Sequence, residues 1–391
     1  MPMHQGFLPR EGLVADPIFR LIGRTALNPG LLLPLLLLAR YTKRGGDLAI
    51  LHPTALARLK QLAWVAVARW ASSWLSRRSL NNWVADRYDW AKEIVLVTGG
   101  AGGIGGHVVQ MLAERGVTVV VLDIQEPTFA AASNVHFFKC DITSTERLAA
   151  VAADIRAKVG HPTVLINNAG VARGKTVLDS TERDIRFTFD VNTLAHYWTT
   201  KEFLPNMVAT NHGMVVTVAS FASFLSVPNM VDYGGSKAAA MAFHEGLSAE
   251  LVTRYNAPRV RTVLVNQGYT KTPLFTGYQQ GMHFLMPAME PETVAEAVVR
   301  KVLGGESGQV ILPSAGAMLT SLRAFPHWYQ HRLRSQSEKL MSTFSGRQVV
   351  KDVERFYTDK EKDKEPEPEH ERPEESTVLV AGQGVDRNGI E

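Results

Sequence analysis

Residues 94–112 read IVLVTGGAGGIGGHVVQML, and this stretch decides the fold. An apolar run leads into a glycine-rich segment and then into helix-forming residues, which is the order of a buried strand, a tight loop and a helix. Glycines at such a loop let the backbone approach a pyrophosphate, whose charge lies at the helix N-terminus. Two spacings are present, G-x-G-x-x-G over residues 100–105 and G-x-x-x-G-x-G over residues 99–105.

Six further apolar, β-branched runs follow, and helix-like stretches separate them. Strands of this kind are buried on both faces, which is typical of parallel sheets. We therefore expect an α/β fold, a Rossmann-type doubly wound parallel sheet of about seven strands over residues 91–313. The six runs are VTVVVLD, VHFFKCD, TVLINNAG, GMVVTVAS, VRTVLVNQG and GQVILP.

The second of the seven strands ends at Asp123. A carboxylate in this place accepts hydrogen bonds from both ribose hydroxyls of an adenosine and repels a 2′-phosphate. No Arg or Lys lies in the glycine loop or directly after Asp123. The sequence therefore favours NAD as cofactor, and NADP remains compatible with it.

The composition bounds the class of protein. The chain has 391 residues, of which 45% are hydrophobic and 20% charged, as expected for a globular protein with a large core. Its single cysteine, Cys140, excludes an intramolecular disulfide and favours a reducing compartment. No metal site is expected.

Charge is distributed unevenly along the chain. Residues 1–92 carry 13 Lys and Arg against 5 Asp and Glu, whereas residues 351–391 carry 7 against 13. Because the basic segment is also rich in leucine and tryptophan, it indicates an anionic membrane surface as partner, and nucleic acid is not expected.

Residues 1–90 are therefore predicted to be a helical membrane-associating segment. The run at 31–39, LLLPLLLLA, is too short for a single span and contains Pro34, so a re-entrant or interfacial segment fits it better. Residues 56–75 combine basic residues with three tryptophans near helical period, which is typical of a helix in a headgroup layer. The alternative is a pair of helices packed on the main domain. No secretory signal is expected.

Two segments follow the predicted sheet. Residues 314–350 are expected to form an amphipathic helical extension, interrupted at Pro326. Residues 351–391 are charged, contain several prolines and have few large apolar residues, so they are predicted to be a disordered tail.

Residues 233–237 read YGGSK, and on a helix this spacing places Tyr233 and Lys237 on one face. The same spacing recurs at 88–92 and 197–201, so spacing alone identifies nothing. Of the three tyrosines, only Tyr233 follows a strand that ends in a serine, Ser220.

These residues resemble those of a known family. T-G-x-x-x-G-I-G over 98–105, N-N-A-G over 167–170, Asn192, Ser220 and YGGSK together resemble the short-chain dehydrogenase/reductase family over about residues 93–313. Within it, the chain resembles the membrane- and lipid-droplet-associated group of 17-beta-hydroxysteroid dehydrogenase type 11 and retinol dehydrogenase type 10.

The resemblance implies a role for each matching residue. Tyr233 would be the general acid/base, Lys237 its partner, Ser220 a hydrogen-bond donor to the substrate oxygen, and Asn192 the residue that orders a relay water. Gln267 replaces the family's usual proline, which puts local rigidity in doubt. The cofactor-binding positions implied are Thr98, Gly99, Gly103, Ile104, Gly105, Asp123, Asp141, Asn168, Ala169, Gly170, Tyr233, Lys237, Gly268 and Thr272.

Elementary chemistry adds two expectations at YGGSK. A phenol that acts near neutral pH needs its pKa lowered by about three units, which an adjacent ammonium and a positive nicotinamide would supply in a dry pocket. The glycines at 234 and 235 cost about 1 kcal/mol each in a helix. We expect them to leave room for cofactor and substrate.

Residues 273–289 contain aromatic residues and methionines, which predicts an adaptable apolar lid. The expected function is an NAD(P)-dependent oxidoreductase that interconverts a hydroxyl and a carbonyl on a lipophilic substrate. It would lie at the endoplasmic reticulum or a lipid droplet with its active site facing the cytosol; a homodimer is compatible with the resemblance. The alternatives are a catalytically silent coat protein and an epimerase or dehydratase of the same superfamily.

Overall fold

The computed structural model describes residues 3–4, 6, 8–279 and 281–362. The chain divides into two compact units, one up to Val349 and one that begins at Val350, and each is described by itself. The first unit contains a seven-stranded sheet in the order β3-β2-β1-β4-β5-β6-β7, and every neighbouring pair is parallel, so the predicted fold is confirmed. Its strands are β1 (Ile94–Thr98), β2 (Thr118–Asp123), β3 (Val135–Lys139), β4 (Val164–Asn167), β5 (Gly213–Val218), β6 (Val260–Gln267) and β7 (Gly308–Leu312).

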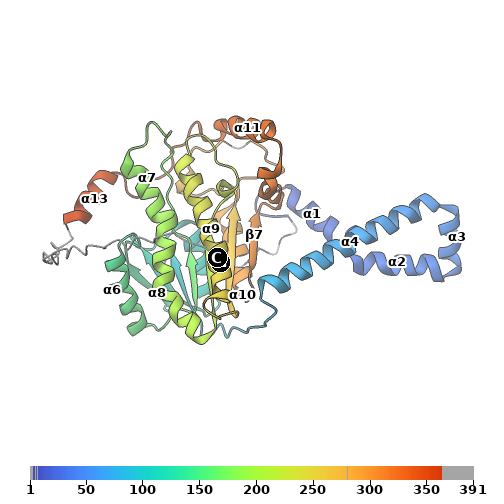
Figure 1. Cartoon of the computed structure of the whole chain (residues 1–391), viewed down its shortest axis with the longest axis horizontal. Coiled ribbons are helices and arrows are strands. Elements are labelled where there is room, and N and C mark those ends of the chain that lie inside the picture. The colour runs from blue at the N-terminus through green and yellow to red at the C-terminus, as the bar shows by residue number, and fades with distance from the viewer. Residues whose placement is uncertain (1–2, 5, 7, 280, 363–391) are drawn as a thin grey trace, which may run out of the picture. The chain divides into compact units, whose positions relative to one another are not determined.

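Helices cover both faces of the sheet (Figure 1). Alternate residues of a strand point to opposite faces, and the core divides accordingly. Val95 and Val97 of β1 pack with one layer of helices, and Leu96 between them packs with the other. The first layer is α5 (Gly103–Ala113) and α10 (Pro291–Leu303); the second is α6 (Thr145–Lys158), α8 (Ala195–Thr210) and α9 (Val231–Thr253).

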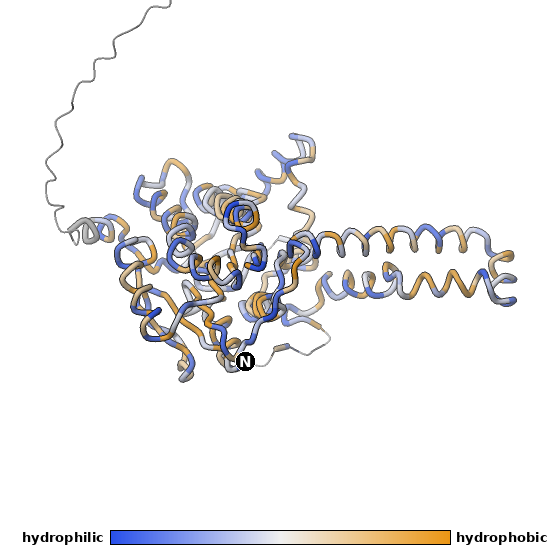
Figure 2. Tube along the Cα trace, turned by 60° about the horizontal axis from the view of Figure 1, so that its bottom comes forward, coloured by the Kyte–Doolittle hydropathy of each residue, from blue (hydrophilic) through white to orange (hydrophobic). Residues whose placement is uncertain are grey.

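The chain before the sheet is helical, with α1 (Ala15–Arg24), α2 (Pro29–Tyr41), α3 (Lys43–Leu51) and α4 (Pro53–Leu80). Helices α2 and α4 lie side by side and are joined by α3; we call α2–α4 the hairpin (Figures 1 and 2). Its buried contact is small and consists of Leu32 from α2 with Ala63 and Ala66 from α4. Most other large apolar side chains of the hairpin are exposed, including Trp64 at 76%.

Within the described residues, no single helix is long and apolar enough to cross a membrane. Helices α1 and α2 pass that test only as a pair, bent by 42° at the short break between them.

The segment between the hairpin and β1 is held to the edge of the sheet where the strands begin. Arg261 of β6, only 1% exposed, donates to the carbonyls of Asn81 (3.0 Å) and Val84 (2.7 Å). The Tyr88 hydroxyl donates to the carbonyl of Gly213, the first residue of β5, over 2.6 Å. These bonds satisfy polar groups that would otherwise be buried without partners.

After β7 the chain continues as η4 (Ser314–Ala324), a series of 3-10 turns, then α11 (His327–Gln336) and α12 (Glu338–Met341). The expected interruption at Pro326 separates η4 from α11. In the second unit, helix α13 (Val353–Lys362) occupies the start of the segment predicted to be disordered. The rest of that predicted tail, residues 363–391, lies outside the described residues.

Candidate active site

Ser220 and Tyr233 meet where β5 ends. Ser220 follows β5 and caps the short helix η2 (Phe221–Ser223), accepting a hydrogen bond from Ala222 N at 3.2 Å. Tyr233 is the third residue of α9, and the Ser220 side chain lies close enough to its phenol to lower the phenol's pKa by hydrogen bonding. The serine and the phenol that the sequence singled out are therefore neighbours.

Burial dominates the pKa of Tyr233 in the protein alone. Burial raises the pKa of Tyr233 to about 12, although the hydrogen bond from Ser220 acts in the opposite direction. Burial also lowers the pKa of Lys237 to about 8. The Lys237 ammonium lies 5.9 Å from the centre of the Tyr233 ring.

Asn192 lies in a one-turn π-helix, η1 (Asp190–Leu194), an irregularity that is frequent at functional sites. Its Oδ1 accepts from Val171 N (2.8 Å), and its Nδ2 donates to Val171 O (2.9 Å) and to the Ser236 hydroxyl (3.0 Å). A Cβ built on Gly170 would lie 3.4 Å from Asn192 Oδ1 and 3.5 Å from Lys237 Nζ. Asn192, Gly170 and Lys237 are therefore neighbours.

The two glycines of YGGSK have a different reason from the one we expected. A Cβ at Gly234 would lie 2.5 Å from the Ser226 hydroxyl, and one at Gly235 would lie 3.2 Å from the Phe189 ring. Both glycines let α9 pack closely on neighbouring protein segments, and the space beside them is filled by protein. Ser236, which the sequence analysis did not single out, positions Asn192 from the same motif.

The other two tyrosine–lysine pairs lie elsewhere. Tyr88 precedes β1 outside any helix, and its hydroxyl holds the segment before the sheet. Tyr197 lies on α8 and is 43% exposed. Neither has Ser220 as a partner.

The glycine loop has the features of an anion site. Helix α5 begins at Gly103, no side chain caps its first N–H groups, and no acidic residue lies in its first turn. Free N–H groups at a helix N-terminus suit a pyrophosphate. A Cβ at Gly105 would lie 2.2 Å from the carbonyl oxygen of Gly99, so only glycine fits there. Ile104 is half-buried and packs on the first core layer.

Thr98 is hydrogen-bonded to both Asn168 and Ala169. The Thr98 hydroxyl accepts from Asn168 N (3.0 Å) and Ala169 N (3.1 Å), and Asn168 Nδ2 donates to the carbonyl of Gly99 (3.0 Å). These bonds join the loop after β1 to the loop after β4. The three residues thus position the glycine loop.

Both acidic residues predicted at the cofactor lie at strand ends. Asp123 Oδ2 accepts from Ala101 N and Oδ1 from Gln125 N, each at 3.0 Å. Each carboxylate oxygen has room for a second donor, as a ribose hydroxyl would require. Asp141 Oδ1 accepts from Thr143 N at 2.9 Å. The residues present therefore fit an adenosine beside the end of β2.

The loop after β6 reaches the glycine loop from the other side. Gly268 N donates to the carbonyl of Leu312 (2.7 Å), and a Cβ at Gly268 would lie 3.0 Å from the Phe221 ring. The Thr272 methyl carbon lies 3.8 Å from the position of a Cβ on Gly103. The predicted lid begins here with η3 (Pro273–Phe275), and the Phe275 ring packs edge-on to Tyr233 at 5.5 Å.

Sequence reasoning missed a second group of residues at this site. Residues 340–348, which we call the strap, contact both the lid and the loop after β4. Met341 is buried in the same apolar cluster as Tyr233. No local pattern predicts this contact, because it joins segments about 175 residues apart, as between Arg173 and Gln348.

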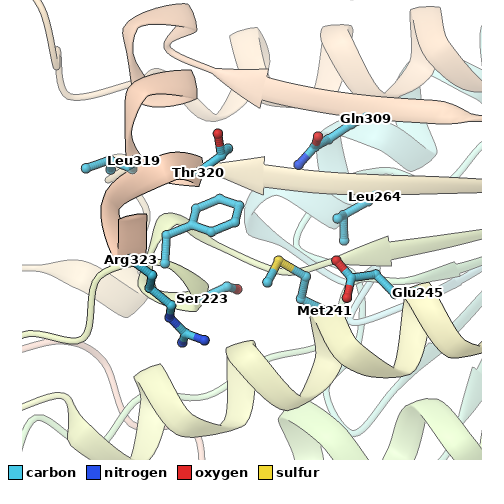
Figure 3. A pocket seen from close by; sticks show the side chains of 9 residues that line it. Ser223, Met241, Glu245, Leu264, Gln309, Leu319, Thr320 and Arg323 are labelled. Atoms are coloured by element: carbon cyan, nitrogen blue, oxygen red, sulfur yellow. The ribbon is translucent and has the colours of Figure 1, made fainter. Parts of the chain in front are cut away.

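A pocket of about 380 Å³ lies between α9, the last strands and η4 (Figure 3). Glu245 and Arg323 are among the side chains that line it, and no predicted site residue is. In the part of the chain that the structure describes, no cluster of His, Cys, Asp or Glu could hold a metal ion.

Comparison with known proteins agrees with this geometry. Residues 93–283 match the family model described as short chain dehydrogenase. The chain is 48% identical over 197 residues to Dehydrogenase RED2 of Cochliobolus heterostrophus. This match covers 50% of this chain and 74% of that protein. It is 36% identical over 242 residues to human Estradiol 17-beta-dehydrogenase 11, covering 59% and 78%.

A solved structure, a short chain dehydrogenase from Burkholderia cenocepacia in complex with NADP, is 27% identical with a TM-score of 0.53, and the match covers 62% of this chain and 98% of that one. The relatives and the fold support a nicotinamide cofactor. This chain is an oxidoreductase that acts on CH–OH groups with NAD or NADP, and it belongs to the short-chain dehydrogenase/reductase family, in the group that includes Estradiol 17-beta-dehydrogenase 11.

Proposed function

We propose that this enzyme interconverts a hydroxyl and a carbonyl on a lipophilic substrate such as a steroid, a retinoid, a long-chain lipid or a polyketide-like molecule. The observation that carries the proposal is that Tyr233, Ser220 and Lys237 lie together, with the aromatic lid residue Phe275 packed edge-on against the phenol. An apolar lid over a polar pair favours a substrate that is apolar except at the reacting oxygen.

Each residue of the site has a separate role in this reaction. When bound, the nicotinamide cofactor supplies or accepts the hydride. Tyr233, protonated near neutral pH because its pKa is about 12, donates its proton to a carbonyl oxygen, or accepts one in the reverse direction. The Ser220 hydroxyl donates to the same oxygen as charge develops on it. Lys237 holds a proton close to the phenol, and Asn192 fixes the backbone beside it.

NAD is the preferred cofactor in this proposal. The first turn of α5 would bind the pyrophosphate, and Asp123 would accept both adenosine ribose hydroxyls and repel a 2′-phosphate. Asp141 would lie beside the adenine. Gly268, Thr272 and Gly170 would line the nicotinamide end.

The hairpin gives the enzyme access to lipids. Its exposed leucines and tryptophans, together with basic residues, support membrane association through residues 1–90. The proposed location is the surface of the endoplasmic reticulum or a lipid droplet, with the active site facing the cytosol. A buried, unpaired Cys140 is compatible with that compartment.

The test uses purified full-length protein with NAD and a panel of retinol, steroid alcohols and long-chain alcohols, and it follows NADH absorbance. Tyr233→Phe is expected to lower kcat by about 10³-fold, because general acid/base catalysis contributes about that much. Tyr197→Phe, which removes an exposed phenol of the same spacing pattern, should retain the wild-type rate. Turnover that survives Tyr233→Phe contradicts the proposal.

A further inference from the structure

The strap, residues 340–348, brings the C-terminal extension back to the catalytic tyrosine. Met341 is 4% exposed and belongs to one apolar cluster with Tyr233 (4% exposed), Met230 and Ala172. The Phe344 ring lies 6.3 Å from Phe275, which itself packs on Tyr233. The strap therefore continues the apolar surface that begins at the reacting phenol.

Main-chain hydrogen bonds hold the strap to the lid. Gln279 N donates to Leu340 O (2.9 Å), Ser345 N to Thr276 O (2.9 Å) and Arg347 N to Pro273 O (2.7 Å). The Thr343 hydroxyl adds a bond to the carbonyl of Gly277 at 2.7 Å. Lid and strap are thus paired along most of residues 273–279.

The far end of the strap is tied to the loop after β4. Gln348 Nε2 donates to the carbonyl of Ala172 (2.8 Å), and Arg173 Nη1 donates to Gln348 Oε1 (2.9 Å). Arg173 Nε in turn donates to Asp184 (2.8 Å). Burial opposes ionisation of Asp184, but hydrogen bonds from Lys175 and Thr181 and the charge of Arg173 lower the pKa of Asp184 to about 2.

The contacts are too close for side chains at several glycines. A Cβ on Gly346 would lie 1.9 Å from the carbonyl oxygen of Leu274, and one on Gly174 would lie 1.9 Å from the Phe344 ring. Contacts this close require the strap to sit in one register on its neighbours. A loosely draped tail would leave more room.

From these contacts we propose that the strap forms one wall of the substrate pocket and that Met341 and Phe344 determine which substrates fit it. This inference rests on the proposed role of Tyr233. The ligand it implies is an alcohol or ketone with a bulky apolar group next to the reacting carbon, which would pack against the paired rings of Phe275 in the lid and Phe344 in the strap. Shortening Phe344 enlarges the pocket on that side and favours the bulkier substrate.

The experiment compares kcat/KM for estradiol and for 2-octanol with NAD in two matched variants. Phe344→Ala is expected to raise the estradiol to 2-octanol ratio by about 10-fold, within the range for changes of a few methylenes in an apolar pocket. Phe325→Ala removes a phenylalanine from the same extension that is 47% exposed, and it should leave the ratio within two-fold. An unchanged ratio in Phe344→Ala, or an equal change in Phe325→Ala, overturns the proposal.

A second pair of variants distinguishes a local displacement of the strap from general misfolding. Gly346→Ala should displace the strap, change the same ratio and speed hydrogen exchange at the amides of Ser345 and Arg347, whereas Gly246→Ala, which has nothing within 4 Å of its Cβ, should do neither. If Gly346→Ala lowers kcat/KM for estradiol and for 2-octanol by the same factor and leaves hydrogen exchange unchanged, the proposed role of the strap is contradicted. Failure of the proposed function is a separate result, because it appears as turnover in Tyr233→Phe.

Discussion

The catalytic end of the sheet and the hairpin treat large apolar side chains in opposite ways. At the sheet, most apolar residues of the inner strands are fully buried, and the site residues Asn192 and Asn168 have hydrogen-bond partners. In the hairpin, the buried cluster is limited to Leu32, Ala63 and Ala66, while leucines and tryptophans on both helices are exposed. One region is stabilised by its own core, and the other needs a surface to cover it.

The first prediction concerns the exposed apolar surface of the hairpin, which can be made polar by substitution. Replacing Leu33, Leu37, Trp64 and Trp70 by Gln leaves the buried cluster intact and, at roughly 1.5 kcal/mol for each side chain, should cost about 6 kcal/mol of membrane transfer free energy. Co-sedimentation with anionic phosphatidylserine vesicles should disappear.

The control replaces four apolar residues that are exposed outside the hairpin: Val177, Leu178, Met318 and Trp328. This control should still sediment with vesicles, and unchanged sedimentation of the hairpin variant would contradict the anchoring proposal. Deleting residues 1–85 is a less clean test, because it removes the carbonyls of Asn81 and Val84 that Arg261 binds.

The second prediction concerns Arg261, through which β6 holds the segment after the hairpin. Arg261→Met leaves the carbonyls of Asn81 and Val84 without their donor, so we expect the free energy of unfolding to fall by about 3 kcal/mol. Urea unfolding followed by circular dichroism measures the change. The exposed Arg259, two residues earlier, is the control, and an equal loss in Arg259→Met would show that the buried bonds are unimportant.

The third prediction concerns Lys237, whose burial should reduce the stability of the protein although its ammonium serves catalysis. The pKa of Lys237 is lowered from 10.5 to about 8, so between these values the unfolded chain binds more protons and the stability contribution of Lys237 rises with pH. Below pH 8 the buried ammonium costs about 3 kcal/mol. Lys237→Met should be inactive, and because it also removes the hydrogen bond from Nζ to Val218 O (2.9 Å), the test is the pH dependence: its stability relative to the wild type should be highest below pH 8 and should fall as the pH rises to 10.5. A stability difference between variant and wild type that stays constant from pH 7 to 10.5 would contradict this prediction.

The smallest expected effect is on cofactor choice. Asp123→Asn removes the charge that repels a 2′-phosphate, and the NADP to NAD ratio of kcat/KM should rise by about 10-fold, or about 1.4 kcal/mol. Asp154→Asn on the outer surface of α6 should not change this ratio. A ratio that stays constant in Asp123→Asn would place the adenosine ribose elsewhere.

The sequence predicted the sheet well because parallel strands are buried on both faces and appear as continuous apolar runs. It also singled out Tyr233 and Ser220 as candidates, and the structure makes them neighbours. It did not find the strap, because pairing between residues 273–279 and 340–348 depends on backbone groups that every sequence has. The reason for Gly234 was missed as well, since its close neighbour, Ser226, lies in a loop before α9.

The hairpin is attached to the rest of its unit at two places with different neighbours. After the hairpin, Tyr88 is bound to the start of β5. Before it, the first residue of α1, Ala15, donates its N–H to the carbonyl of Phe284 in the lid at 2.9 Å, and Asp16 accepts from Ser314. A movement of the lid therefore carries α1 along or breaks this hydrogen bond. Substrate binding at the lid and membrane binding through the hairpin are then coupled, and the coupling is reciprocal. If vesicles raise substrate affinity by some factor, substrate must raise vesicle affinity by the same factor.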